Sequence, residues 1–155
     1  MIAGFFIDPI ERWANHVLIL MKNNTVGVFC MGEEFISHGI TRTEIEATGR
    51  VFGRKGEITE IVPIITGHIN ETFKVVYRNG DAVEKYTFQA INTNVFKKPD
   101  EVMSNISAVT EYIRNKYVSM GESYDRRVLE FQKAEETGLY YYIDEENHFW
   151  RVYKY

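Results

Sequence analysis

The chain has 155 residues, which is enough for one ordinary domain with its own core and too few for two. Hydrophobic residues make up 45% of the sequence and charged residues 26%, a balance typical of a globular protein rather than a disordered or fibrous one. The net charge of −4 argues against a nucleic-acid-binding protein, which would need a basic face.

Membrane association and secretion are also disfavoured. No apolar run approaches the ~18 residues of a membrane span. The N-terminus places Asp8, Glu11 and Arg12 after its first apolar residues, which is the wrong charge order for a signal peptide. The single cysteine, Cys30, excludes an internal disulfide and a cysteine-rich zinc site. We therefore expect a cytoplasmic protein that does not bind membranes.

Residues 1–40 give the weakest structural signals and form an unassigned N-terminal extension. Their apolar patches, Val17–Met21 and Val26–Met31, fit either a strand pair or a short helix. The signals become clearer from residue 41, so we treat 41–155 as the domain.

The first predicted helix runs from about Arg42 to Arg54. Thr41-x-x-Glu44 has the form of a capping box, in which the hydroxyl and the carboxylate satisfy free N–H groups of the first turn. Apolar residues then follow at helical spacing, and Gly53 and Gly56 mark the end.

Strands are predicted at Glu57–Ile65, Glu71–Arg78 and Glu84–Ile91. The second alternates well between two faces, as a half-buried strand does. Asn79-Gly80-Asp81 predicts a hairpin turn between the second and third strands, because Asn and Gly tolerate positive φ.

A second helix is predicted to begin at Pro99, with Asp100 and Glu101 as the acidic first turn that helix starts prefer. Apolar residues then recur every three or four positions and predict a buried stripe. The stripe consists of Val102, Ile106, Val109, Ile113 and Tyr117.

Three further strands are predicted at Arg127–Ala134, Leu139–Ile143 and His148–Lys154. The order of helix, three strands, helix and three strands predicts an α+β fold with a mostly antiparallel sheet of five to six strands, crossed by one helix. The sequence stops directly after a strand rich in aromatic residues, so we expect this domain to be half of a larger protein.

The first candidate site is the loop Thr66-Gly67-His68-Ile69-Asn70 between two predicted strands. A glycine in such a turn lets backbone N–H groups approach phosphate oxygens, and His68 and Asn70 add side-chain donors. An ordinary hairpin loop with one glycine fits the same spacing and is the simpler interpretation from spacing alone.

Gln89 is the second candidate, because it is an amide in the middle of a predicted strand. It is either a solvent-facing side chain or the partner of Asn105, which shares the apolar side of the second helix. By contrast, His16, His38 and His148 have no partner at metal-ligand spacing, and the chain alone is not expected to build a metal site.

Four blocks in order carry a family resemblance. They are Gly67-His68-Ile69-Asn70-Glu71-Thr72-Phe73, Tyr86–Phe96 with its Phe88-Gln89-Ala90-Ile91-Asn92-Thr93-Asn94 core, Asn105-Ile106-x-x-Val109-Thr110, and Trp150-Arg151-Val152-Tyr153-Lys154. The sequence from about Thr41 to Tyr155 resembles the N-terminal lobe of the N-acetylhexosamine 1-kinases, in the aminoglycoside phosphotransferase and choline kinase superfamily.

The resemblance implies a protein-kinase-like small lobe that holds ATP. Gly67, His68 and Asn70 would cover the phosphates, and Ile61, with Ala90 or its neighbours, would line the adenine slot. The backbone of the hinge strand would bind the adenine edge; this strand runs from Val152 to Tyr155 and includes Tyr153. Gln89 would stand where protein kinases carry the phosphate-binding lysine, and Asn105 near the position of the glutamate that pairs with that lysine.

The resemblance further implies Mg-dependent phosphorylation of the anomeric hydroxyl of an N-acetylhexosamine; choline, homoserine and fructosamine are alternative acceptors in the superfamily. The catalytic Asp and the metal ligands would belong to a C-terminal lobe outside this sequence, so we expect no turnover by this chain alone. The alternative is a non-enzymatic module that forms a homodimer or binds a partner through the apolar lobe-docking face near Trp150, Tyr153 and Tyr155.

Overall fold

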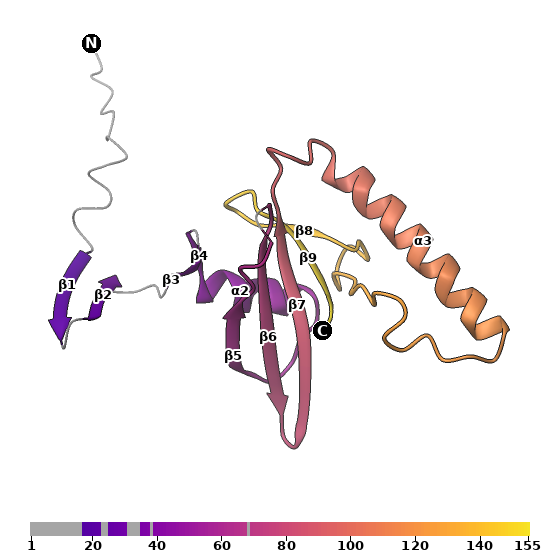
Figure 1. Cartoon of the computed structure of the whole chain (residues 1–155), viewed down its shortest axis with the longest axis horizontal. Helices are drawn as coiled ribbons and strands as arrows, with labels where there is room; N and C mark the ends of the chain where they lie inside the picture. The colour runs from indigo at the N-terminus through magenta and orange to yellow at the C-terminus, as the bar shows by residue number, and fades with distance from the viewer. Residues whose placement is uncertain (1–16, 23–24, 31–34, 38, 68) are drawn as a thin grey trace, which may run out of the picture. The chain divides into compact units, whose positions relative to one another are not determined.

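The computed structural model describes residues 17–22, 25–30, 35–37, 39–67 and 69–155 (Figure 1). The chain divides into two compact units, Met1–Thr43 and Glu44–Tyr155. In the first unit β1 (Val17–Lys22) pairs with β2 (Thr25–Cys30), and β3 (Phe35–Ser37) pairs with β4 (Ile40–Thr41). Of the two interpretations of the N-terminal apolar patches, the strand pair is therefore confirmed.

The second unit contains a five-stranded antiparallel sheet in the order β5-β6-β7-β9-β8. Its strands are β5 (Glu57–Pro63), β6 (Glu71–Asn79), β7 (Ala82–Ile91), β8 (Tyr142–Ile143) and β9 (Phe149–Lys154). Helix α2 (Arg42–Val51) leads into the sheet, and helix α3 (Pro99–Ser119) connects β7 to β8. The α+β class and the antiparallel sheet are confirmed.

The hairpin between β6 and β7 follows the predicted turn. Asn79 pairs with Ala82, so Gly80 and Asp81 form a two-residue loop, and Gly80 has a φ of 59°. Positive φ in such a loop matches the twist of the flanking strands, which is why this short turn sets the register of the whole hairpin.

Helix α2 covers one face of the sheet. Ile45 and Phe52 are fully buried on this side, and the helix passes so close to β6 that a Cβ at Gly49 would overlap the Tyr77 hydroxyl. The alternation along β6 explains the docking, because Phe73, Val75 and Tyr77 all leave the same face and are buried there. The predicted start at Arg42 is confirmed, and the helix ends at Val51, three residues before the predicted end.

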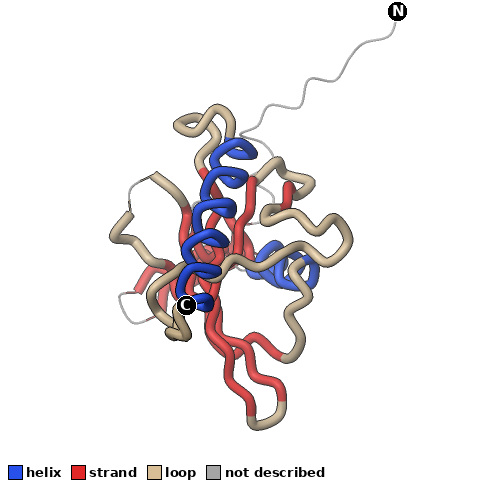
Figure 2. Tube along the Cα trace, turned by 90° about the vertical axis from the view of Figure 1, so that its right-hand side faces the viewer, coloured by secondary structure: helices blue, strands red, loops and turns tan. Residues whose placement is uncertain are grey.

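Helix α3 lies on the other side of the sheet, as the two perpendicular views show (Figures 1 and 2). The predicted start at Pro99 is confirmed, but the predicted stripe is only partly buried: Val109 is 57% exposed. The buried residue of α3 is Met103, which packs with Ile91 and Phe149. The spacing of apolar residues predicts a helix correctly, whereas the depth of burial depends on how the helix meets the sheet.

The strand predicted in the segment before β8 is not formed. The strand predicted at Arg127–Ala134 is an irregular segment that meets β9 through one bridge, between Phe131 and Tyr153. The next predicted strand shrinks to the two residues of β8. In this segment Phe131 packs against Tyr153 and against the cluster of Ile91, Met103 and Phe149, whereas Leu129 is 52% exposed. Among the described residues, neither helix has the length and apolar composition that a membrane crossing requires.

Candidate functional site

Three polar side chains stand side by side on the α3 side of the sheet, and we call them the polar row. They are Thr72 on β6, Gln89 on β7 and Arg151 on β9, and each is in register with the next. Residues paired in this way on antiparallel strands leave the same face of the sheet, so the row crosses its three central strands.

Hydrogen bonds connect the polar row from end to end. The Gln89 Nε2 group donates to Thr72 Oγ1 at 2.8 Å. The Gln89 Oε1 atom accepts from Arg151 Nε at 2.9 Å and from Arg151 Nη2 at 2.6 Å. These bonds fix which end of the amide faces each neighbour, because only the oxygen can accept from a guanidinium.

The predicted amide pair between Gln89 and Asn105 is not formed. Both polar ends of Gln89 are used within the polar row, and Asn105 is exposed on α3. The α3 residue that reaches this site is Met103, whose sulfur lies 3.6 Å from Arg151 Nη1. Sequence spacing predicted Asn105 on the apolar side of the helix, but the buried residue of α3 is Met103, two positions before it.

Arg151 carries a positive charge that the described residues do not balance. No described carboxylate forms an ion pair with it, although the side chain is half-buried and lies 5.7 Å from the Phe131 ring centre. Burial lowers the pKa of the guanidinium, which nevertheless stays charged. On the same face Lys74 has a partner, since its Nζ lies 2.9 Å from Glu60 Oε1.

The loop between β5 and β6 begins and ends beside the polar row. The Ile64 N–H donates to the Thr72 carbonyl at 2.7 Å, and Asn70 Oδ1 accepts from the Asn92 N–H at 2.9 Å. Asn70 therefore ties the loop to the end of β7. A Cβ built at Gly67 would meet nothing within 4 Å, so packing does not require a glycine there. His68 lies outside the described residues.

The structure places Ile61 and Val152 away from the polar row. Ile61 pairs with Val75, and Val152 pairs with Phe88, on the face that α2 covers. Ala90 is buried on that face too, opposite Trp150. Ile61 and Ala90 therefore lie on the face opposite Gln89, because a one-residue step along a strand changes the face. That Ile61, with Ala90 or its neighbours, lines an adenine slot stays a prediction.

The predicted hinge strand, β9, uses most of its outer backbone groups internally. The Val152 carbonyl accepts from the Gln132 N–H at 2.9 Å, and the Lys154 N–H donates to the Glu130 carbonyl at 3.0 Å. Those two groups are therefore not available to a purine edge, and binding of adenine by the rest of this strand stays a prediction. The Tyr153 side chain does lie on the face of the polar row, where its ring packs edge-on against Phe131 at 5.4 Å.

Tyr155 lies beside a cleft rather than within the polar row. The residue is 64% exposed and donates its N–H to the Lys85 carbonyl. A cleft of about 330 Å³ is lined by the segment from Tyr124 to Glu130 together with Lys154 and Tyr155. No lining residue of this cleft belongs to the polar row.

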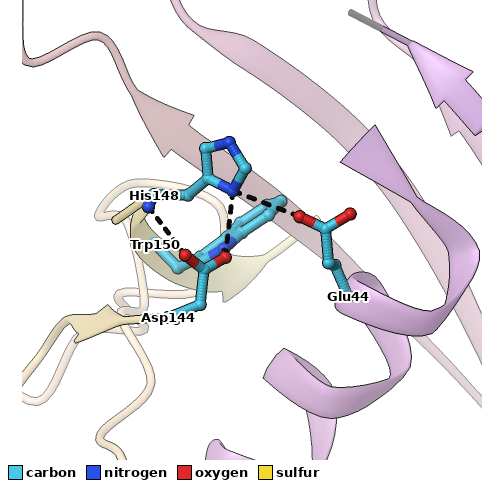
Figure 3. A network of polar contacts seen from close by, with 4 residues as sticks. All are labelled: Glu44, Asp144, His148 and Trp150. Atoms are coloured by element: carbon cyan, nitrogen blue, oxygen red, sulfur yellow. Dashed lines mark hydrogen bonds and ion pairs between the residues drawn. The ribbon is translucent and has the colours of Figure 1, made fainter. Parts of the chain in front are cut away.

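A second polar cluster connects α2 to the turn between β8 and β9 (Figure 3). His148 Nδ1 lies 3.0 Å from Asp144 Oδ2 and 3.2 Å from Glu44 Oε1. Asp144 also accepts from Trp150 Nε1 at 2.7 Å and from the His148 N–H at 2.7 Å. We call these four residues the histidine cluster.

The prediction that His148 lacks metal-ligand partners is wrong. Ligand atoms of Glu44, Asp144 and His148 all lie within 4.8 Å of one another, a spacing at which one ion could be held. Asp144 and His148 are four residues apart around a predicted turn, and this spacing could have indicated that they lie close together. Nothing in the sequence around Glu44 indicates that it joins them. In the present arrangement Trp150 and His148 already satisfy the Asp144 carboxylate, so the cluster functions as a structural connection.

Comparison with models of known protein families found no match for this chain. A search of curated proteins likewise found no significant relative.

Proposed function

We propose that the unit Glu44–Tyr155 is the nucleotide-binding small lobe of a phosphotransferase with a protein-kinase-like fold. The antiparallel five-stranded sheet and the helix after its third strand support this proposal, because they are the elements that the family resemblance implies. The same resemblance suggests ATP as the donor and the anomeric hydroxyl of an N-acetylhexosamine as the acceptor.

The observation that carries the proposal is the polar row beside the β5–β6 loop. By the resemblance, Gln89 would occupy the strand position at which a kinase carries its phosphate-binding lysine. In the structure its side chain is held on both sides by hydrogen bonds. Phosphoryl transfer relies on positioning and on neutralising the phosphate charge, and a fixed row of donors with an unbalanced cation suits that task.

Gly67 adds support from the loop. Nothing in the described structure crowds its Cβ position, and its φ is not in the left-handed region, so neither packing nor backbone geometry calls for glycine. Close approach of a ligand to the backbone is a third reason for a glycine in a loop. In this proposal the Gly67 backbone faces the phosphates, and Asn70 keeps the loop attached to β7.

Magnesium would reach the nucleotide from a second lobe. The histidine cluster is unsuited to this ion's usual role, because Asp144 bonds Trp150, whose side chain leaves the sheet on the face opposite Arg151. When bound, Mg²⁺ neutralises phosphate charge. What this chain contributes is binding and orientation of the nucleotide, so we propose that the chain alone does not catalyse transfer.

The direct test is titration of the chain with ATP, followed by calorimetry and by the melting temperature. We expect saturable binding and a higher melting temperature, since a ligand that binds only the folded state stabilises it. Gln89→Leu should weaken binding, whereas Thr59→Val, on the edge strand β5, should not. A folded chain that binds neither ATP nor ADP at millimolar concentration contradicts the proposal.

A second candidate function is self-association through α3. Large apolar side chains are exposed on this helix and just after it, and surfaces of this kind tend to find partners. They are Val109, Tyr112, Val118 and Met120. A concentration-dependent dimer in light scattering, lost in Tyr112→Glu and without any response to nucleotide, would favour this function over nucleotide binding.

A further inference from the structure

We propose that Arg151, on β9, supplies the phosphate-binding positive charge that the β7 position lacks because it holds Gln89. The inference rests on the proposed function and names a residue for it. A cation moved to the neighbouring strand, rather than an uncharged amide, would then hold the phosphates.

The position of Arg151 follows from the register. Gln89 and Arg151 are paired residues on adjacent antiparallel strands, so their side chains start from neighbouring points on one face. The guanidinium extends across Gln89, with both Nε and Nη2 bonded to Oε1 at 2.9 and 2.6 Å. The positive charge of Arg151 therefore lies next to the amide at the end of the Gln89 side chain.

The donor inventory leaves room for an anion. A guanidinium has five N–H groups. Two of them bond Gln89 Oε1, and one contacts the Met103 sulfur, a weak acceptor, at 3.6 Å. Among the described residues the remaining two N–H groups have no acceptor, and a planar guanidinium presents such groups in the geometry that phosphate oxygens match.

The charge balance points the same way. A half-buried cation is costly unless an anion or several acceptors compensate it. Lys74, on the same face, has Glu60 at 2.9 Å, whereas no described carboxylate pairs with Arg151. A phosphate group would supply the missing negative charge, and the β5–β6 loop that ends next to Thr72 would bring backbone N–H groups to the same anion.

The experiment measures binding of three probes to the intact chain by calorimetry: ATP, adenosine and inorganic tripolyphosphate. In Arg151→Met we expect about 10- to 100-fold weaker binding of ATP and tripolyphosphate, the range for loss of a hydrogen bond to a charged group, and unchanged binding of adenosine. Arg78→Met is the matched control, because it removes one positive charge from an exposed position at the far end of β6 and should change none of the three. Arg151→Lys should recover part of the lost affinity.

A measurement on the unaltered chain keeps the test decisive if Arg151→Met fails to fold. The Arg151 Nε–H signal in a ¹⁵N NMR spectrum, identified by its absence in Arg151→Lys, should shift during titration with tripolyphosphate. Equal affinity of Arg151→Met and the parent chain for tripolyphosphate, or an unmoved Nε–H signal at saturation, overturns the inference.

The outcomes separate the inference from the proposed function. Binding of ATP and adenosine that does not depend on Arg151 leaves the nucleotide-binding lobe standing and overturns the role of Arg151. Binding of tripolyphosphate through Arg151, with ATP bound no more tightly than tripolyphosphate and adenosine not bound, supports the anion site and contradicts the nucleotide-binding lobe. Binding of none of the three probes overturns both.

Discussion

The polar row and the histidine cluster differ in which partners their charged groups have, although they meet at consecutive residues of β9. Trp150 leaves one face of the sheet and donates to Asp144, while Arg151 leaves the other face and bonds only an amide and a thioether among described partners. In the histidine cluster, two carboxylates surround one histidine. In the polar row, a cation faces no carboxylate.

The difference indicates which of the two clusters is built for the fold and which for a ligand. Buried polar groups that satisfy one another stabilise a single arrangement, and adding anything to them costs existing bonds. An unbalanced, half-buried cation instead gains from an added anion. We therefore interpret the histidine cluster as a structural connection between α2 and β9 and the polar row as the ligand site.

The largest expected effect is on the structural side. Trp150→Ala should lower the free energy of unfolding by about 3–5 kcal/mol, because the indole is fully buried against Phe73 and its removal leaves a cavity. Urea denaturation measures the change. The exposed Tyr155→Ala is the control and should change stability by less than about 0.5 kcal/mol. A small effect of Trp150→Ala would show that this face is not the core.

Asp144→Asn should destabilise the fold by about 1.5–3 kcal/mol, since an amide cannot accept all the hydrogen bonds that the carboxylate accepts from Trp150 and His148. Its side chain is only 9% exposed, so water does not replace the lost bonds. Asp81→Asn, in the exposed β6–β7 turn, serves as the control. If the two variants have equal stabilities, the histidine cluster does not stabilise the fold.

Tyr77 makes the α2 side of the sheet sensitive to alkaline pH. Burial raises the pKa of its hydroxyl to about 12 from 10.0. Between pH 10 and 12 the folded state therefore keeps a proton that the unfolded state loses. The free energy of unfolding is unaffected by this group below pH 10 and falls by about 2 kcal/mol as the pH rises to 12. Tyr77→Phe should lack this part of the slope in urea denaturation between pH 10 and 12. An identical slope in both proteins contradicts the assignment.

Arg151→Met should have the smallest effect on stability, within about 1 kcal/mol, because removal of a half-buried charge and its desolvation cost offsets most of the loss of the two hydrogen bonds to Gln89. Any loss of phosphate binding would then be measured in a protein of nearly unchanged stability. A stability loss as large as that of Asp144→Asn would place Arg151 among the structural residues and remove the contrast between the two clusters.

Local chemistry was enough to predict much of the backbone. The capping box before Arg42, the Asn-Gly turn at residue 79 and the proline at residue 99 all act within a few residues, and each element begins or turns where they predict. The strand predicted at Arg127–Ala134 failed because apolar alternation there reflects packing by an irregular segment. For Gln89 the sequence left two alternatives open, a solvent-facing amide or a partner of Asn105, and the partners in the structure are Thr72 and Arg151.

The sequence by itself determined where helices and strands form in residues 41–119. It also determined that the fold is α+β with an antiparallel sheet, because both features depend on the spacing of apolar residues, on turns and on helix caps. Only the tertiary structure decided which side chains meet. Strand register placed Arg151 rather than Asn105 beside Gln89 and put Ile61 on the opposite face, and the docking of α2 brought Glu44 to His148. Such contacts join residues far apart in the chain, and a one-residue change of strand register would exchange the partners within the sheet.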